Sequence, residues 1–418
     1  MSDAYQLNES RPHLPEKRHV VVIEPTSTNP SRTNPVQGGS KIQFLNLPTG
    51  ASAVGSYISV KESYIKMTVR ARTATAKDAT LNKLGALGLF DHVKVLSSSY
   101  VVEDSQHHSR LASLLRDVDE NDRNRAGVKE TLEGTSGDDE GATLSATSGD
   151  VSAEKTMCIP LVGQWWNSHQ MTPCHAITDL AYELTLNSDL NCVNQSSNTA
   201  KGIPVGIDIV DFKLHLCYVE VSPESKNMLT NRTGLSWSAP TWETIRDNLS
   251  AVAQETLKIP SAKSSTKSLI VEFQNAGANN ATGEKQDFHA RVNPKVGSYQ
   301  FNVNGELYPR QEIEGNEESL MQGMRTFHND HGYNNKLTPF GTGAADGKTV
   351  ANDKYFIAMS LESHNKSNSS YSGRSTLAQN PMVTIKSSAA AFEASNVFYH
   401  VQYDQKYSIE NGIVRISY

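Results

Sequence analysis

Two histidines and an aspartate stand close together late in the chain. His328 and His331 are three residues apart, and Asp330 lies between them. Imidazole nitrogens and a carboxylate are common ligands for Zn²⁺ and other divalent cations, which makes this the one metal-like pattern in the sequence. The spacing is not that of the helical H-E-x-x-H motif, and Gly332 indicates a loop. We therefore expect a polar loop and predict no metal ligand here.

A second group of oxygen ligands runs from Asp138 to Glu140, inside the glycine-rich segment 134–141. Consecutive carboxylates suit Ca²⁺, but their spacing is not that of an EF-hand loop. Between residues 117 and 155, eleven acidic residues stand against four basic ones. A charge run of this kind is typical of a solvated segment. We interpret about 127–155 as an acidic loop insertion that faces outward.

The four cysteines are Cys158, Cys174, Cys192 and Cys217, and none forms a C-x-x-C pair. Neither a zinc ribbon nor a redox motif is therefore encoded. We expect small buried or edge residues in a reduced compartment. A disulfide from Cys158 to Cys174 or Cys192 remains an open alternative, because spacing does not determine pairing.

Adjacent tryptophans at 165 and 166 resemble the aromatic platforms on which sugars stack. If this segment is a strand, neighbouring side chains face opposite sides, so at most one of the two can stack on a ligand. Packing in the core or at an interface is the favoured interpretation for Trp165 and Trp166.

Several common catalytic motifs are missing from the sequence. It contains no G-x-S-x-G elbow, no P-loop and no G-x-G-x-x-G. Paired carboxylates for glycoside hydrolysis meet only in space, so the sequence leaves that alternative open. We predict no enzyme, no catalytic or cofactor-binding residues and no cofactor.

The elements that would position any such chemistry are mostly short strands. Runs of β-branched and aromatic residues are separated by Gly, Pro and Asn. The predicted strands include 42–45, 57–60, 64–69, 90–96, 159–166, 179–186, 268–273 and 299–303. Asn304-Gly305 predicts a hairpin turn. Apolar residues at 111, 114, 115 and 118 predict a helix between about 105 and 125, and two shorter helices are predicted near 241–257 and 320–328.

Two strictly alternating runs lie a little under 200 residues apart. Phe212–Glu220 closes the first half of the chain, and Val397–Tyr403 closes the second. Period-2 alternation is the signature of a half-buried strand. The chain has 418 residues, beyond the size at which one hydrophobic core stops growing, so two domains are expected. Two similar-sized β-sandwiches are predicted.

The first 40 residues are rich in Pro, Ser, Asn and Thr, and their charges cancel. A segment that binds a genome would be a block of Lys and Arg, so we expect an extended arm that pairs with a neighbour. The whole chain has a net charge of −6, and we predict no direct sequence-specific binding of nucleic acid. The sequence shows no apolar secretory signal, so synthesis in the host cell without one is expected.

Three passages carry a resemblance to a known family. They are Ile159-Pro160-Leu161 leading to 179–184, Tyr299–Val303 with the turn at 304–305 and Tyr308-Pro309, and the closing segment 403–412. Together they resemble the double jelly-roll major capsid proteins of double-stranded DNA viruses, the lineage that includes adenovirus-like, Polinton-like and nucleocytoplasmic large DNA viruses.

This resemblance implies a mainly β fold of two consecutive eight-stranded antiparallel jelly-roll barrels with short helices and long loops. The expected division is an arm at 1–40, a first jelly roll at 41–222, and a connection with the second jelly roll at 223–418. The resemblance also implies a homotrimer with a pseudo-hexagonal outline, in a shell that often surrounds an internal membrane.

The predicted function is that of a major capsid protein that self-assembles into homotrimeric, pseudo-hexameric capsomers of an icosahedral virion shell. The expected partners are copies of itself and penton or minor capsid proteins, with an internal viral membrane as a further candidate. Two alternatives stay open. One is another virion structural protein, such as a single jelly-roll coat or a spike. The other is a carbohydrate-binding or carbohydrate-active β-sandwich protein.

Overall fold

The structure is a computed structural model, and it describes the chain with gaps. The described residues are 16–27, 29–53, 55–73, 79–82, 84–119, 128–135, 142–144, 153–194, 204–221, 235–275, 291–315, 318–319, 321–323, 326, 355–362 and 372–418. They form two compact units. The described part of the first unit lies in 16–109, 128–240 and 405–417. The second unit holds 110–119, 241–404 with its gaps, and Tyr418.

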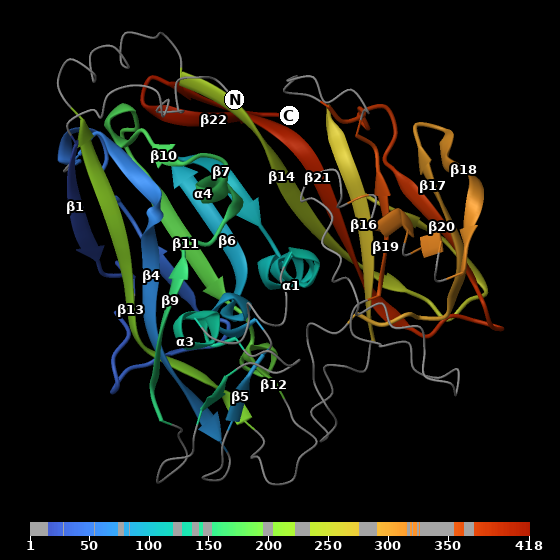
Figure 1. Cartoon of the computed structure of the whole chain (residues 1–418), viewed down its shortest axis with the longest axis horizontal. Coiled ribbons are helices and arrows are strands. Elements are labelled where there is room, and N and C mark those ends of the chain that lie inside the picture. The colour runs from blue at the N-terminus through green and yellow to red at the C-terminus, as the bar shows by residue number, and fades with distance from the viewer. Residues whose placement is uncertain are drawn as a thin grey trace. The chain divides into compact units, whose positions relative to one another are not determined.

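Antiparallel strands make up most of the first unit. One sheet has six strands in the order β1-β13-β4-β10, with β2 on β13 and β9 on β4. Its strands are β1 (Glu16–Ile23), β2 (Val36–Gln37), β4 (Tyr57–Thr73), β9 (Lys155–Pro160), β10 (Met171–Thr172) and β13 (Pro204–Val221). Figure 1 shows β1, β13 and β4 side by side, as their pairing requires.

The second sheet of this unit has four strands in the order β3-β11-β6-β7. These are β3 (Lys41–Phe44), β6 (Phe90–Ser97), β7 (Tyr100–Ser105) and β11 (Ala181–Leu186). A small third sheet joins β12 (Val193–Asn194), β5 (Ala79–Leu81) and β8 (Thr143–Leu144). The short helices are η1 (Gly50–Ser52), η2 (Gly85–Leu89), α3 (Val128–Glu133), α4 (Gln164–Asn167), η3 (Cys174–Ala176) and η4 (Asp189–Cys192).

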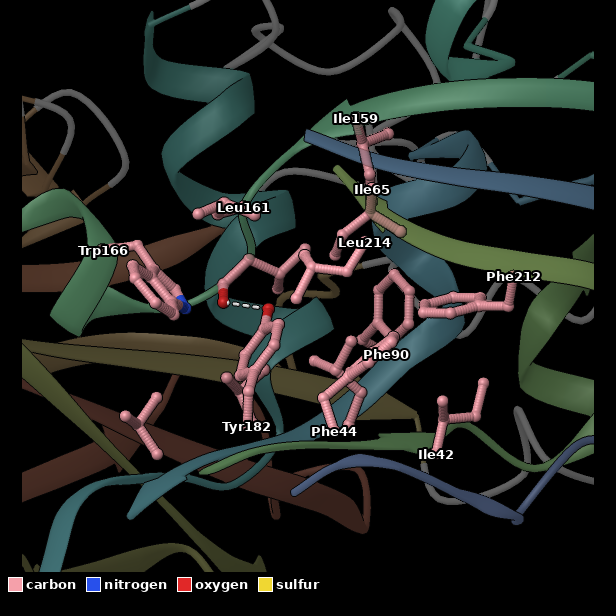
Figure 2. Close-up of a cluster of buried hydrophobic side chains, with 14 of the residues drawn as sticks. Ile42, Phe44, Ile65, Phe90, Ile159, Leu161, Trp166, Tyr182, Phe212 and Leu214 are labelled. Atoms are coloured by element: carbon pink, nitrogen blue, oxygen red, sulfur yellow. Dashed lines mark hydrogen bonds between the residues drawn. The ribbon is translucent and has the colours of Figure 1, made fainter. Parts of the chain in front are cut away.

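The core of the first unit lies between its two larger sheets. Phe44 and Phe90 come from the four-stranded sheet and meet Phe212 of β13, with ring centroids 5.9 and 6.2 Å apart. Figure 2 shows these rings together with Ile65 and Leu214 from the six-stranded sheet. Two sheets that bury their apolar faces against each other form a sandwich.

The predicted alternation of the first closing strand is confirmed in β13. Its inward side chains Phe212, Leu214, Leu216 and Tyr218 are fully buried. The strand pairs with β4 on one side and with β1 on the other. On the opposite face Cys217 and Val219 are buried as well, so the half-buried pattern holds only up to Leu216.

Two sheets also make up the second unit. One has the order β14-β21-β16-β19, with β22 on β21, and the other has the order β15-β20-β17-β18. The strands are β14 (Leu235–Leu249), β15 (Gln254–Lys258), β16 (Thr266–Asn275), β17 (Val296–Val303), β18 (Glu306–Glu314), β19 (Phe356–Ser360), β20 (Met382–Ser387), β21 (Ser395–Glu410) and β22 (Ile413–Ser417). The division between units falls inside β14 and inside β21, and it assigns β22 to the first unit.

The hairpin predicted at Asn304-Gly305 is confirmed. It joins β17 to β18, and Val303 pairs with Glu306 across it. Asn304 and Gly305 both have positive φ, 53° and 83°. Two left-handed residues in a two-residue loop are the mark of a type I′ turn, whose twist matches that of the flanking strands.

The second alternating run lies in β21, but it differs from the expected half-buried strand. Val397, Tyr399 and Val401 pack in the core of the second unit. Phe398 and His400, on the opposite face, are buried as well. Helix α1 (His108–Asp119) accounts for part of this burial, because the Arg110 guanidinium lies 4.7 Å from the Phe398 ring centroid. A third layer therefore covers a face that the alternation pattern assigns to solvent.

Three predicted elements need correction or lie outside the described residues. The helix predicted near 241–257 is wrong, because this segment contains the end of β14 and β15, whose residues pair in sheets. The strand predicted to continue to Trp166 ends at Pro160, and helix α4 follows it. The helix predicted at 320–328 lies largely outside the described residues.

The predicted domain limits differ in detail from the observed units. The start of the predicted arm, 1–15, is outside the described residues, whereas residues 16–23 form β1, which pairs with β13 of its own chain. The described residues of the acidic insertion include α3 and β8. Glu133 and Leu144 are buried there, so this part of the insertion packs onto the first unit.

Candidate functional site

The tryptophan pair lies in the core of the first unit. Trp165 and Trp166 are both fully buried in α4. Trp165 packs edge-on against Tyr407, and Trp166 against Tyr182, with ring centroids 5.3 and 5.7 Å apart. Figure 2 shows Trp166 and Tyr182 on the inner side of the sandwich. Core packing is confirmed for both residues, and neither ring is open to a sugar.

A buried carboxylate holds the start of α4. Both oxygens of Glu103 accept backbone hydrogen bonds, from Gln164 N and Trp165 N, each at 2.8 Å. Gly163 precedes the helix with φ +126°, and a Cβ there would come within 2.9 Å of the Glu103 carboxylate. Burial raises the pKa of Glu103, although these two backbone donors and Ser105 oppose the rise. The role of this carboxylate is to cap a helix end.

Replacing Glu103 with alanine is expected to lower the free energy of unfolding of the first unit by about 1–3 kcal/mol. The reason is that two backbone N–H groups, one buried and one partly buried, lose their acceptor. Chemical denaturation of the full chain measures the change. Glu103→Gln keeps one acceptor oxygen and is expected to lose less. An alanine variant as stable as the natural chain would rule out this capping role.

One Ser-His pair has hydrogen-bond geometry that resembles part of a nucleophile site. Ser168 Oγ lies 2.8 Å from His169 Nδ1, and His169 Nε2 lies 2.6 Å from Thr172 Oγ1. Burial lowers the pKa of His169 to about 3. A base this weak is poorly matched to proton abstraction near neutral pH. Ser168 Oγ also donates to the Trp165 carbonyl at 2.7 Å, so we interpret the pair as part of the packing around α4.

The second unit contains the most concentrated group of buried charges. Arg110 Nε donates to Glu272 Oε1 at 2.7 Å, and Arg291 donates to Asp117. His400 Nε2 lies 3.3 Å from Glu272 Oε1. All five side chains are almost completely buried. We call this group (Arg110, Asp117, Glu272, Arg291 and His400) the ionic cluster.

The charges of the two arginines and two carboxylates in the ionic cluster balance. Burial acts to raise the pKa of Glu272, but its interactions with Arg110, His400 and Arg291 outweigh burial and hold that pKa at about 2. Glu272 is therefore ionised across the physiological range. A carboxylate that is ionised, paired and sealed from solvent is suited to holding elements together rather than to proton transfer.

Helix α1 supplies two members of the ionic cluster. Arg110, Ser113, Leu114 and Asp117 are buried at positions i, i+3, i+4 and i+7, the spacing of one helix face. The predicted helix is confirmed, and Leu111 and Leu114 are buried as expected. The two charged members were missed, because Arg and Asp on a helix normally face solvent.

The remaining candidate ligands do not gather into a site within the described residues. There, no three His, Cys, Asp or Glu side chains meet in a way that would hold a metal ion. The groups at 328–331 and 138–140 lie outside that part of the chain. None of the four cysteines forms a disulfide, and Cys174, Cys192 and Cys217 are buried, as expected. No described helix is long and apolar enough to cross a membrane.

Strand edges are the other candidate surface. In the second unit, edge strand β18 carries Pro309 and several charged residues, which discourage pairing with another strand. In the first unit, edge strand β1 pairs with β13 alone among the described strands. It exposes Val20 and Val22, 62% and 50% of their surface. An exposed apolar edge strand is a template for association.

Comparison with known proteins gives no match to any family model and none to a curated protein. Solved structures do match. PBCV-1 VP54, fitted into a reconstruction of the virophage Sputnik, is 11% identical with a TM-score of 0.62, over 99% of each chain. The Faustovirus major capsid protein is 10% identical with a TM-score of 0.62, over 97% of this chain and 92% of the other. The mavirus major capsid protein is 12% identical with a TM-score of 0.55, over 100% and 93%.

The chain therefore has the double jelly-roll fold of viral major capsid proteins. The likeness covers nearly the whole of each chain, so both units take part in it. The predicted fold class, mainly β with a double jelly roll, is confirmed. Two sandwiches in one chain contradict the alternative of a single jelly-roll coat protein.

Proposed function

We propose that this chain is a major capsid protein of a double-stranded DNA virus. Three copies would form a capsomer with a pseudo-hexagonal outline, and many capsomers would form an icosahedral shell. The observation that carries the proposal is the fold match over 99% of this chain and 99% of PBCV-1 VP54. At 11% identity, this match supports the fold directly and the function by analogy.

The geometry of two sandwiches in one chain favours this arrangement. Each unit has its own core between two antiparallel sheets. Three chains related by a three-fold axis would place six such sandwiches in a ring, and a six-cornered outline can tile a curved wall. The partners proposed are therefore copies of the same chain first, then penton or minor capsid proteins, with an internal viral membrane as a further candidate. The proposed location is the virion.

The described chemistry supports a structural role over an enzymatic one. Two groups come nearest to catalytic arrangements. The ionic cluster is buried and paired within itself, and the half-buried His169–Ser168 pair is hydrogen-bonded to Thr172 and to the Trp165 carbonyl. A carbohydrate-active protein would present aromatic or carboxylate groups in an open cleft. Trp165, Trp166 and Trp237 are instead buried in the first unit.

The mass of the purified protein tests the proposal. We expect a particle of about 137 kDa, three times the 45.8 kDa chain, by analytical ultracentrifugation at low protein concentration. The reason is that a closed three-fold ring satisfies the repeated contact without leaving an open end. A monomer at every concentration, or a stable dimer with no trimer, would contradict the capsomer proposal.

A further inference from the structure

The outer edge of β1 is exposed, and among the described strands none pairs with it there. Val20 and Val22 point away from the core of the first unit, whereas Val21 and Ile23 pack against that core. The strand is the last member of its sheet on that side (Figure 1). Arg18 and Glu24 flank the valines, and their side chains are 54% and 57% exposed. Within the chain, Arg18 pairs with Glu62, and Glu24 Oε1 lies 4.0 Å from Lys213 Nζ. The edge is therefore apolar in the middle, with an exposed ion pair near each end.

A second copy of the same strand is the occupant that this pattern fits. Two identical antiparallel strands in one continuous sheet share a two-fold axis, and opposite residues then lie on the same face. Only pairings whose residue numbers add to an even total meet this condition. Few registers are therefore possible, and each can be judged by the side chains that it places opposite one another.

One register matches the outward side chains from Arg18 to Glu24. With Val21 opposite Val21 of the second copy, Val20 faces Val22, and Arg18 faces Glu24 at both ends. Moving the centre to Val20 places Arg18 opposite Val22. Moving it to Val22 places Glu24 opposite Val20. Cross-strand pairs of opposite charge and of β-branched residues stabilise a sheet, whereas like charges directly opposite destabilise it.

We propose that β1 forms a two-fold contact between copies of this chain, antiparallel to β1 of a second copy and centred on Val21. A two-fold contact is isologous and closes on itself, so it does not build a three-fold ring. It would instead join one capsomer to the next. The inference goes beyond the proposed function, because a contact that closes between two copies is distinct from the repeated contact that builds a three-fold ring.

Charge reversal tests the register. Arg18→Glu alone, or Glu24→Arg alone, places like charges opposite each other at both ends of the contact. The association constant between particles is expected to fall about tenfold. The double variant Arg18→Glu/Glu24→Arg restores opposite charges and is expected to recover the association. Light scattering as a function of protein concentration measures this step, and thermal unfolding confirms that each variant stays folded.

A matched pair of substitutions tests the valines. Val20→Lys is expected to weaken association between particles by tenfold or more. The reason is that an apolar pair is lost and a charge is buried in the contact. Leu377→Lys changes a side chain that is equally exposed, 62%, in the second unit. The control is expected to leave association unchanged. Neither change is expected to alter the mass of the trimer.

A cysteine at the centre of the contact gives a direct readout. Val21→Cys would place two thiols opposite each other, at a separation that a disulfide spans. Mild oxidation is expected to link two chains through position 21, identified by peptide mass spectrometry. Val22→Cys, opposite Val20 in this register, is expected to give no such link to itself.

The outcomes separate this inference from the proposed function. One outcome would overturn the β1 contact without affecting the capsomer proposal. In it, the charge-reversed variants form trimers that associate as strongly as the natural chain, and the Val21→Cys variant gives no disulfide between chains. Dimers linked through position 21 without any trimer would support the β1 contact and contradict the capsomer. Association of the natural chain only in the presence of another virion protein would also overturn the β1 contact, because the occupant of the edge would then be a different chain.

Discussion

Replacing Glu272 with glutamine is expected to lower the free energy of unfolding of the second unit by about 3–5 kcal/mol. Glu272 accepts from Arg110 at 2.7 Å and lies near Arg291 and His400, all in the buried ionic cluster. The amide is nearly the same size, so packing is kept. The two guanidinium groups lose one of the two negative charges that balance them, in a place that water does not reach. Urea or thermal unfolding of the full chain measures the loss.

A surface glutamate provides the control. Glu393 pairs with Lys295 at 3.1 Å, but both side chains are about half exposed. Glu393→Gln is therefore expected to change stability by less than about 1 kcal/mol, since exposed ion pairs contribute little. Equal effects of the two substitutions would contradict the view that burial makes the ionic cluster important.

The dependence of stability on pH provides a second test of the role of Glu272. The pKa of Glu272 in the folded chain is about 2, below the ordinary value of 4.5. Because folding lowers this pKa, the ionised carboxylate stabilises the folded chain at every pH above the pKa of the unfolded chain. This stabilisation is lost as the pH falls from about 4.5 toward 2. The shift corresponds to about 3 kcal/mol. The stability difference between the natural chain and Glu272→Gln is expected to shrink over this range, and a constant difference would contradict the assignment.

Replacing Trp166 with alanine is expected to cost the first unit about 3–5 kcal/mol. The side chain is fully buried and packs edge-on against Tyr182 (Figure 2). Its removal opens a cavity between sheets that pack at the density of an organic crystal. Denaturant unfolding, followed by circular dichroism, measures the loss.

Phenylalanine at the same position separates packing from hydrogen bonding. The Trp166 Nε1 atom makes no hydrogen bond to the described residues. Trp166→Phe therefore loses no polar partner there and is expected to cost distinctly less than the alanine change, because most of the ring volume remains. If phenylalanine were as damaging as alanine, the cost would not arise from cavity volume.

Local patterns in the sequence predicted the elements that depend on local information. The alternation from Phe212 to Tyr218 is the buried face of β13, and Asn304-Gly305 forms the expected hairpin turn. Both signals lie within a few residues, so distant parts of the chain do not change them. The spacing of Leu111 and Leu114 likewise predicted helix α1.

The parts that were missed depend on partners far away in the sequence. Arg110 and Glu272 are 162 residues apart, and Glu103 caps a helix 62 residues later. A charged residue gives no local sign that it will be buried beside a distant partner. The same reason explains why β21 is not the half-buried strand that its alternation predicts. Its other face is covered by helix α1, which comes from the first half of the sequence. The helix predicted near 241–257 is wrong for a similar reason, because the strands there, β14 and β15, are formed by pairing with β21 and β20, far away in the sequence.

The proposal that three copies of this double jelly roll form one capsomer is tested most directly by electron cryo-microscopy of the purified protein. We expect particles with three-fold symmetry and a six-cornered outline, in which each chain contributes two β-sandwiches. Particles without a three-fold axis, or a ring in which each chain contributes a single sandwich, would contradict the account.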